Sequence, residues 1–156
     1  MVRLGINTMV WSGGYNGEQL ALLERIKDWG YEVVELGVFD FEAVDPAIVR
    51  RALAATGLSL TVASALPVKL NLVSEDAGVR ARTREWIESA VRVTAEMGGS
   101  VLAGPLYIPV GDLPGRRRTA AEWERAVEEY QTLSETVKAA NVKVAIEPLN
   151  RFETYF

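Results

Sequence analysis

Apolar and polar residues repeat along this chain with two different periods, and segments of the two kinds follow each other regularly. Short runs rich in β-branched residues have the length and composition of strands. They cover residues 4–11, 33–39, 58–66, 100–106 and 142–147. The longer segments between them repeat apolar residues every three to four positions, which predicts amphipathic helices. These helices cover about 18–29, 46–56, 76–97 and 119–140.

Residues that favour helix ends agree with these boundaries. Asp45 is a suitable N-cap and Pro46 suits the first helical position, while Gly57 suits the end of the same helix. A glycine pair at 98–99 follows the third helix in the same manner. The chain therefore alternates strand and helix without a linker between two domains.

This alternation predicts the α/β class, with a parallel sheet and right-handed crossovers. A TIM barrel and an open doubly-wound sheet both fit it. No G-x-G-x-x-G follows the first strand and no P-loop pattern occurs. The predicted strands instead end in polar or bulky residues, which favours the shared mouth of a barrel; these are Trp11, Phe39 or Asp40, Ser64, Tyr107 and Glu147. Strand order 1-2-3-4-5 would support the barrel, and 2-1-3-4-5 the flavodoxin-like sheet.

The last strand delivers a carboxylate to its C-terminal end. Glu147 falls on the strand face opposite the aliphatic residues, as does Glu35 in the second strand, so both are expected to face the interior of a barrel. Pro148 removes a backbone donor and ends the strand near Glu147. A buried carboxylate needs a partner. Either a structural salt bridge, for example with Arg151, or a metal or catalytic role can provide one.

Composition narrows the chemistry. The 156 residues contain no cysteine and no histidine, which excludes disulfides, thiolate nucleophiles, histidine-based zinc sites and Ser-His-Asp triads within the chain. Any metal must be bound by oxygen, which favours Mg²⁺ or Mn²⁺. Hydrophobic residues make up 49% of the chain, enough for one core, and no long apolar run predicts a membrane span. We expect a single cytoplasmic domain.

The charge of the chain bears on its partners. The net charge is −4 and the pI is about 5.0, so no nucleic-acid partner is expected. The arginines at 116–118 form the one basic cluster. We interpret it as a solvated loop, with a phosphate or sugar contact as the alternative.

Four stretches resemble the ketose 3-epimerases, the family of the D-tagatose and D-psicose (allulose) 3-epimerases. They are residues 5–11 (GINTMVW), 29–36 (WGYEVVEL), 102–107 (LAGPLY) and 146–154 (IEPLNRFET), of which the last is the most specific. This family is part of the wider group of xylose-isomerase-like TIM barrels, and the resemblance runs in order along essentially the whole chain.

The resemblance implies roles for individual residues. Glu147 would be a metal ligand and one of two carboxylates that transfer protons, and Glu153 would contact the sugar oxygens near the reacting carbon. Trp11, Ser64 and Tyr107 would lie near the substrate. The cofactor would be a divalent metal, Mn²⁺ first, with Mg²⁺ or Co²⁺ as alternatives, and the substrate a free ketose. Tyr155 stands where the closest relatives lead us to expect a histidine.

Length sets a further expectation. A TIM barrel needs roughly 250 residues, and this chain has 156. We therefore expect residues 1–156 to be the N-terminal portion of a TIM-barrel domain, with five strands and four helices. The remaining ligands implied by the resemblance, an Asp, a His and a second Glu, would lie on strands six to eight. Alone, the chain is expected to be inactive and, because both sheet edges are open, to form a homo-oligomer.

Other functions fit parts of the same pattern. Keto-acid isomerases and apurinic endonucleases share the superfamily, although an endonuclease would need a basic surface and histidine ligands. A non-catalytic half-barrel scaffold that self-associates also fits a chain without histidine.

Overall fold

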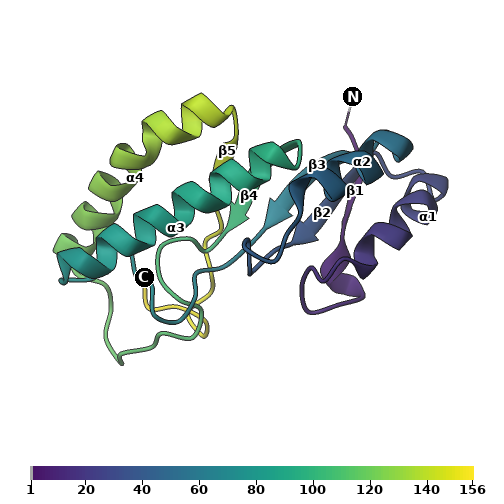
Figure 1. Ribbon diagram of the computed structural model, residues 1–156. Coiled ribbons are helices and arrows are strands. Elements are labelled where there is room, and N and C mark those ends of the chain that lie inside the picture. Colours follow the sequence, from purple (N-terminus) through teal and green to yellow (C-terminus); the bar gives the residue numbers. More distant parts are fainter. Residues whose placement is uncertain (1) are drawn as a thin grey trace.

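The computed structural model describes residues 2–156 and contains one parallel sheet of five strands (Figure 1). The strands are β1 (Gly5–Asn7), β2 (Val33–Gly37), β3 (Ser59–Ala63), β4 (Gly99–Gly104) and β5 (Lys143–Ile146). Their order in the sheet is β1-β2-β3-β4-β5, and every neighbouring pair is parallel. The barrel-type prediction is confirmed, and the flavodoxin-like order is not observed.

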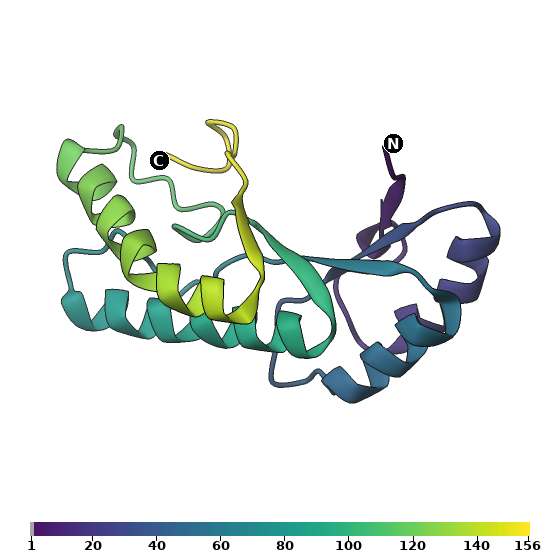
Figure 2. The same ribbon diagram turned by 90° about the horizontal axis from the view of Figure 1, so that it is seen from above.

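Four α-helices lie along one side of the curved sheet and leave its other side free of helices (Figures 1 and 2). They are α1 (Leu23–Asp28), α2 (Pro46–Thr56), α3 (Ala77–Glu96) and α4 (Ala120–Ala140), with 3-10 turns η1 (Thr8–Val10) and η2 (Glu18–Leu22). Within residues 2–156, no helix combines the length and apolar composition needed to cross a bilayer.

The core lies between the helices and the sheet face that they cover. Val34, Leu36, Leu60, Val62 and Leu102 alternate along the three central strands, and each is at most 2% exposed. Burying each such side chain contributes about 1.5–3 kcal/mol. The residues between them in sequence are directed to the face without helices.

Side-chain caps fix where α2 and α4 begin. Asp45 accepts hydrogen bonds from the amides of Ala47 and Ile48, with Pro46 at the first helical position, and Gly57 ends α2 at φ 69°. The predicted boundaries of this helix are therefore confirmed. A capping box at Thr119 begins α4 in a related way.

The N-terminal segment differs from the prediction. The strand expected at 4–11 ends at Asn7, whose side chain accepts from the amide of Met9 at 2.7 Å and starts η1. The chain then turns, and Trp11 lies beyond the strand with its ring stacked on Trp29 at 5.9 Å. The helix expected at 18–29 begins as the 3-10 turn η2 and becomes α-helical only at Leu23.

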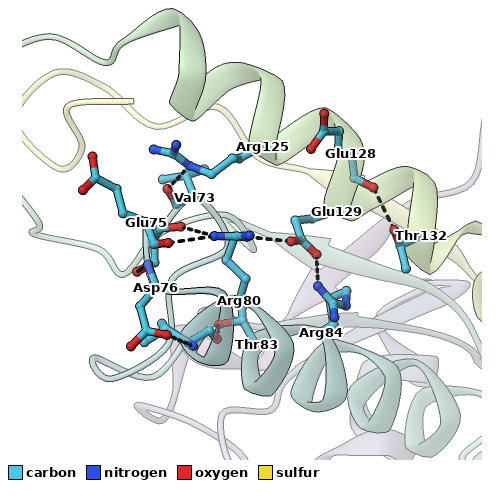
Figure 3. A network of polar contacts seen from close by, with 12 residues as sticks. Val73, Glu75, Asp76, Arg80, Thr83, Arg84, Arg125, Glu128, Glu129 and Thr132 are labelled. Carbon is cyan, nitrogen blue, oxygen red and sulfur yellow. Dashed lines mark hydrogen bonds and ion pairs between the residues drawn. The ribbon is translucent and has the colours of Figure 1, made fainter.

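An ionic network joins α3 to α4 (Figure 3). Glu129 of α4 is 7% exposed and accepts from Arg80 at 2.8 Å and from Arg84. Arg80 also donates to two carbonyl groups just before α3, and Arg125 donates to the carbonyl of Val73 at 2.8 Å. The network therefore also anchors the loop between β3 and α3.

We predict that Glu129→Ala lowers the free energy of unfolding by about 1–3 kcal/mol, because two partly buried guanidinium groups lose their shared carboxylate. Urea denaturation measures this. The matched control is Glu128→Ala, which changes the exposed side chain of the preceding residue of α4. We expect it to change stability by less than about 0.5 kcal/mol. Equal losses in both variants would contradict the prediction.

Candidate functional site

A cavity of about 570 Å³ opens on the helix-free side of the sheet, at the C-terminal ends of the strands. Its polar lining comes from Asn7 at the end of β1, Glu35 in β2, Ser64 after β3, and Glu147 and Glu153 after β5. Apolar side chains, among them those of residues 9, 39 and 110, line the rest. Four of the five strands thus bring a polar group to one space.

The floor of the cavity is formed by Asn7 and Glu35, which belong to a row of polar side chains across three strands. Asn7, Glu35 and Thr61 are register partners in β1, β2 and β3. The Asn7 amide donates to the Glu35 carboxylate at 2.9 Å, and the Thr61 hydroxyl donates to its other oxygen at 3.3 Å. Glu35 therefore faces the cavity on the helix-free side of the sheet, as its position between aliphatic residues predicted. Asn7 is a lining residue that the sequence pattern did not single out.

Ser64 contributes a free hydroxyl. The residue is 3% exposed, lines the cavity, and its Oγ has no hydrogen-bond partner among residues 2–156. Its carbonyl oxygen lies so close to Gly104 that a Cβ added there would be 1.8 Å away, and Gly104 has φ 143°. Only glycine fits at position 104. The Ser64 amide donates to the carbonyl of Ala103 at 2.9 Å, and this hydrogen bond joins the ends of β3 and β4.

Glu147 follows β5 directly. Its amide donates to the carbonyl of Gly104 at 3.0 Å, and its exposed side chain lines the cavity. In the described part of the chain Glu147 takes part in no ion pair, and Arg151 stacks on Phe152 at 4.9 Å instead. The alternative of a structural salt bridge between Glu147 and Arg151 is therefore wrong.

Glu153 is carried by the tight loop after β5. The amides of Glu153 and Thr154 both donate to the carbonyl of Asn150, at 3.0 and 3.1 Å, and the Asn150 side chain donates to the Glu153 carboxylate. The amide of Gly111 donates to the carbonyl of Glu153 at 2.8 Å. The loop between β4 and α4 thereby holds Glu153 at the cavity.

Two residues that the resemblance places near the substrate do not line this cavity. Trp11 is not part of the cavity lining and stacks on Trp29. Tyr107 is 5% exposed and lines a different, apolar cavity of about 680 Å³ between α4 and the end of β5. The structure thus brings together Ser64, Glu147 and Glu153, but not Trp11 and Tyr107.

A complete metal centre is not formed by these residues. Residues 2–156 contain no group of three or more side chains of the types that hold a metal ion. Glu147 can supply one oxygen ligand, whereas Mg²⁺ and Mn²⁺ are bound by several.

Arginines 116 and 118 are engaged within the protein and do not form a free basic patch. Arg116 donates to both oxygens of Glu122, at 3.0 and 2.7 Å, and Arg118 stacks over the ring of Trp123 at 4.6 Å. Tyr155, found where a histidine was expected, also donates to Glu122, at 2.9 Å. These contacts hold the end of the described chain against the start of α4.

The same contacts change the acidity of their members. The hydrogen bond from Arg116 holds the pKa of the Glu122 carboxyl far below its usual range, against the opposing effect of burial. Burial, followed by the hydrogen bond to Glu122, raises the pKa of Tyr155 to about 12. Glu122 therefore remains charged at any moderately acidic pH while the protein is folded.

This predicts a pH-dependent contribution to stability. Because the pKa of Glu122 is lower in the folded than in the unfolded chain, its charge stabilises the fold fully above about pH 5 and progressively less as the pH falls further. Urea denaturation of the parent and Glu122→Gln should therefore show a stability difference that shrinks from about pH 7 to about pH 3. Gln keeps the shape and removes the charge. The exposed Glu124→Gln serves as control, and a difference for Glu122→Gln that is constant with pH would contradict the assignment.

The strand order, the helices on one side and a polar cavity at the C-terminal strand ends define an incomplete barrel of the TIM type. The chain belongs to the family described as "Xylose isomerase-like TIM barrel", which matches residues 23–156.

Two relatives that match almost the whole of this chain are named as 3-epimerases. The chain is 29% identical to the "Probable ketose 3-epimerase" of Synechocystis sp. (strain ATCC 27184 / PCC 6803 / Kazusa), over 99% of this chain and 54% of the relative. It is 31% identical to the "L-ribulose 3-epimerase" of Mesorhizobium japonicum (strain LMG 29417 / CECT 9101 / MAFF 303099), over 99% of this chain and 52% of the relative. The resemblance to ketose 3-epimerases is confirmed.

Solved structures of 3-epimerases have the same fold as this chain. A structure of an L-ribulose 3-epimerase superimposes with a TM-score of 0.89 at 31% identity, over 99% of this chain and 52% of that one. A D-allulose 3-epimerase from Methylomonas sp., at 23% identity, shares the fold with a TM-score of 0.90. The chain spans about half the length of the relatives it matches.

Proposed function

We propose that residues 1–156 are the N-terminal part of one TIM-barrel domain, in a metal-dependent enzyme that epimerises C3 of free ketoses. The observation that carries this proposal is the meeting of Glu147, Glu153 and the unpartnered hydroxyl of Ser64 in one cavity at the strand ends. The 3-epimerase names of the relatives support it. In this proposal the activity depends on residues that complete the barrel, and the enzyme is cytoplasmic.

The chemistry suits these side chains. C3 of a ketose is adjacent to the C2 carbonyl, so removing its proton gives an enediolate, and returning a proton to the opposite face inverts C3. Glu147 would transfer the proton on one face. Glu153 can accept hydrogen bonds from the sugar hydroxyls, and Ser64 can donate one to a sugar oxygen. The cavity of about 570 Å³ falls in the size range of small-molecule sites.

A divalent ion, Mn²⁺ in this proposal with Mg²⁺ or Co²⁺ as alternatives, would stabilise the negative charge that develops on the two sugar oxygens. Glu147 would supply one of its ligands. The ligands that complete the site would come from outside residues 2–156, which contain no group of three or more side chains suited to holding a metal ion.

We predict that Glu147→Gln lowers kcat for ketose epimerisation by about 10²- to 10⁴-fold, the usual contribution of a general acid–base group. The measurement uses the protein at its natural length with Mn²⁺ and D-fructose, D-tagatose or L-ribulose. It follows both the C3 epimer by chromatography and solvent deuterium entering C3. The exposed Glu124→Gln is the control. Turnover by the parent that is unchanged in Glu147→Gln would remove Glu147 from the proposed role, and no turnover by the parent with any of these ketoses would overturn the proposed reaction.

We also propose that residues 1–156 produced alone pair with a second copy. β5 is the last strand of the sheet, and the cavity of about 680 Å³ beside it is lined by apolar groups of α4 and of the residues after β5. Open strand edges and exposed apolar grooves favour association. In this proposal, residues 1–156 alone form a non-catalytic half-barrel whose site remains exposed to solvent.

Light scattering at micromolar concentration is expected to give at least twice the mass of 17.1 kDa for residues 1–156. Val127→Glu, which places a charge in the groove on α4, should shift the chain toward the monomer. The matched control is Ile48→Glu, because Val127 and Ile48 are 41% and 44% exposed and only Val127 lines the groove. A monodisperse monomer of the parent chain would disprove the pairing.

A further inference from the structure

Tyr107 has a role in the structure although it is not among the residues that line the cavity. Its hydroxyl donates to the carbonyl of Glu147 at 3.2 Å and accepts from the amide of Leu149 at 3.3 Å. The two hydrogen bonds reach either side of Pro148. One side chain from the loop after β4 therefore holds the backbone at the point where β5 ends.

The backbone pairing between β4 and β5 ends at this point. The amide of Glu147 still donates to the carbonyl of Gly104, at 3.0 Å, and this is the last bond of the ladder type. Pro148 has no N–H. The phenolic hydroxyl of Tyr107 can both donate and accept, so it provides a partner for the carbonyl of Glu147 and for the amide of Leu149.

Tyr107 is itself held firmly. Its ring is 5% exposed and packs on Phe156 at 5.2 Å, and its carbonyl accepts from the amide of Leu72 at 2.9 Å. The preceding carbonyl, that of Leu106, accepts from the buried hydroxyl of Tyr130 on α4 at 2.8 Å. Tyr107 is thus held by its own contacts with Phe156 and with the loop between β3 and α3, whereas the Tyr130 hydroxyl contacts the neighbouring Leu106.

We infer that Tyr107 is a positioning residue, which aims the Glu147 carboxylate at the cavity through the backbone and does not contact the substrate. This inference rests on the proposed function, because it assigns Glu147 the proton transfer. It replaces the direct substrate contact expected for Tyr107. The physical reason is that a carboxylate must be placed to within a fraction of an ångström to transfer a proton at full rate.

The test compares Tyr107→Phe with Tyr130→Phe in the protein at its natural length. Each variant removes a phenolic hydroxyl that is hydrogen-bonded to the backbone, to Glu147 and Leu149 in the case of Tyr107 and to Leu106 in the case of Tyr130. A general loss of stability should therefore appear in both variants. We expect Tyr107→Phe to lower kcat about 10- to 100-fold with KM within about twofold of the parent. Tyr130→Phe should leave kcat within about threefold at a comparable loss of stability in urea.

Hydrogen exchange of the Leu149 amide, followed by NMR, gives a readout without substrate or metal. Exchange should become about tenfold faster in Tyr107→Phe and remain unchanged in Tyr130→Phe. Unchanged Leu149 exchange in Tyr107→Phe, or equal losses of kcat in the two variants, would overturn the positioning role. Faster exchange in Tyr107→Phe, in a protein that epimerises no ketose, would support the Tyr107 contacts and overturn only the proposed reaction.

Discussion

Residues of a β-strand point alternately to its two faces, and in this sheet one of the faces must be buried under helices. Val34, Leu36, Leu60 and Val62 occupy that face with almost no exposure. Glu35 lies between the first two and is thereby placed on the face without helices. A slip of one residue would bury its carboxylate under the helices and expose the aliphatic side chains, at a cost of several kcal/mol. The packing of the core thus also fixes the polar floor of the cavity.

The walls of the cavity depend on contacts between successive loops. The end of β4 approaches the end of β3 so closely at Gly104 and Ser64 that no side chain fits between them. The loop after β4 then reaches forward to β5 through the amide of Gly111, which donates to the carbonyl of Glu153 at 2.8 Å. These contacts link the end of β3, the end of β4 and the loop after β5 in succession. The site residues lie near one another because the strands are parallel and sequential, which brings their C-terminal ends to the same edge.

The parts of this arrangement that follow from local patterns could be predicted from the sequence. The strands and most helices follow from hydrophobic periodicity, the ends of α2 from Asp45 and Gly57, and the placement of Ser64 and Glu147 from their positions at strand ends. The turn at η1 could not be predicted in this way, because it arises when the Asn7 side chain captures the amide of Met9. Residues 4–11 alone have the composition of a continuous strand.

Tyr107 illustrates the limit of local patterns most clearly. From its position after β4 it was expected to face the common mouth, but the chain turns at Gly104 and buries the ring beside α4. Its contacts with the backbone of Glu147 and Leu149 connect residues about 40 positions apart. The hydrophobic periodicity of the sequence cannot predict a contact between residues so far apart. It exists because Pro148 leaves backbone groups without sheet partners, and a buried carbonyl or amide requires a hydrogen bond from whatever group can reach it.

The proposed reaction places one more demand on this geometry. Inverting a carbon atom requires a proton to leave from one face of the sugar and return to the other, so two groups must stand on opposite sides of C3. All five strand ends described here form one side of the cavity, and Glu147, on the last of them, can serve one face only. In the proposed reaction, the second proton-transfer group would approach from the side of the cavity that residues 2–156 leave open. In this proposal, the further metal ligands would approach Glu147 from the same side. Closing the barrel would therefore complete both the acid–base pair and the metal site.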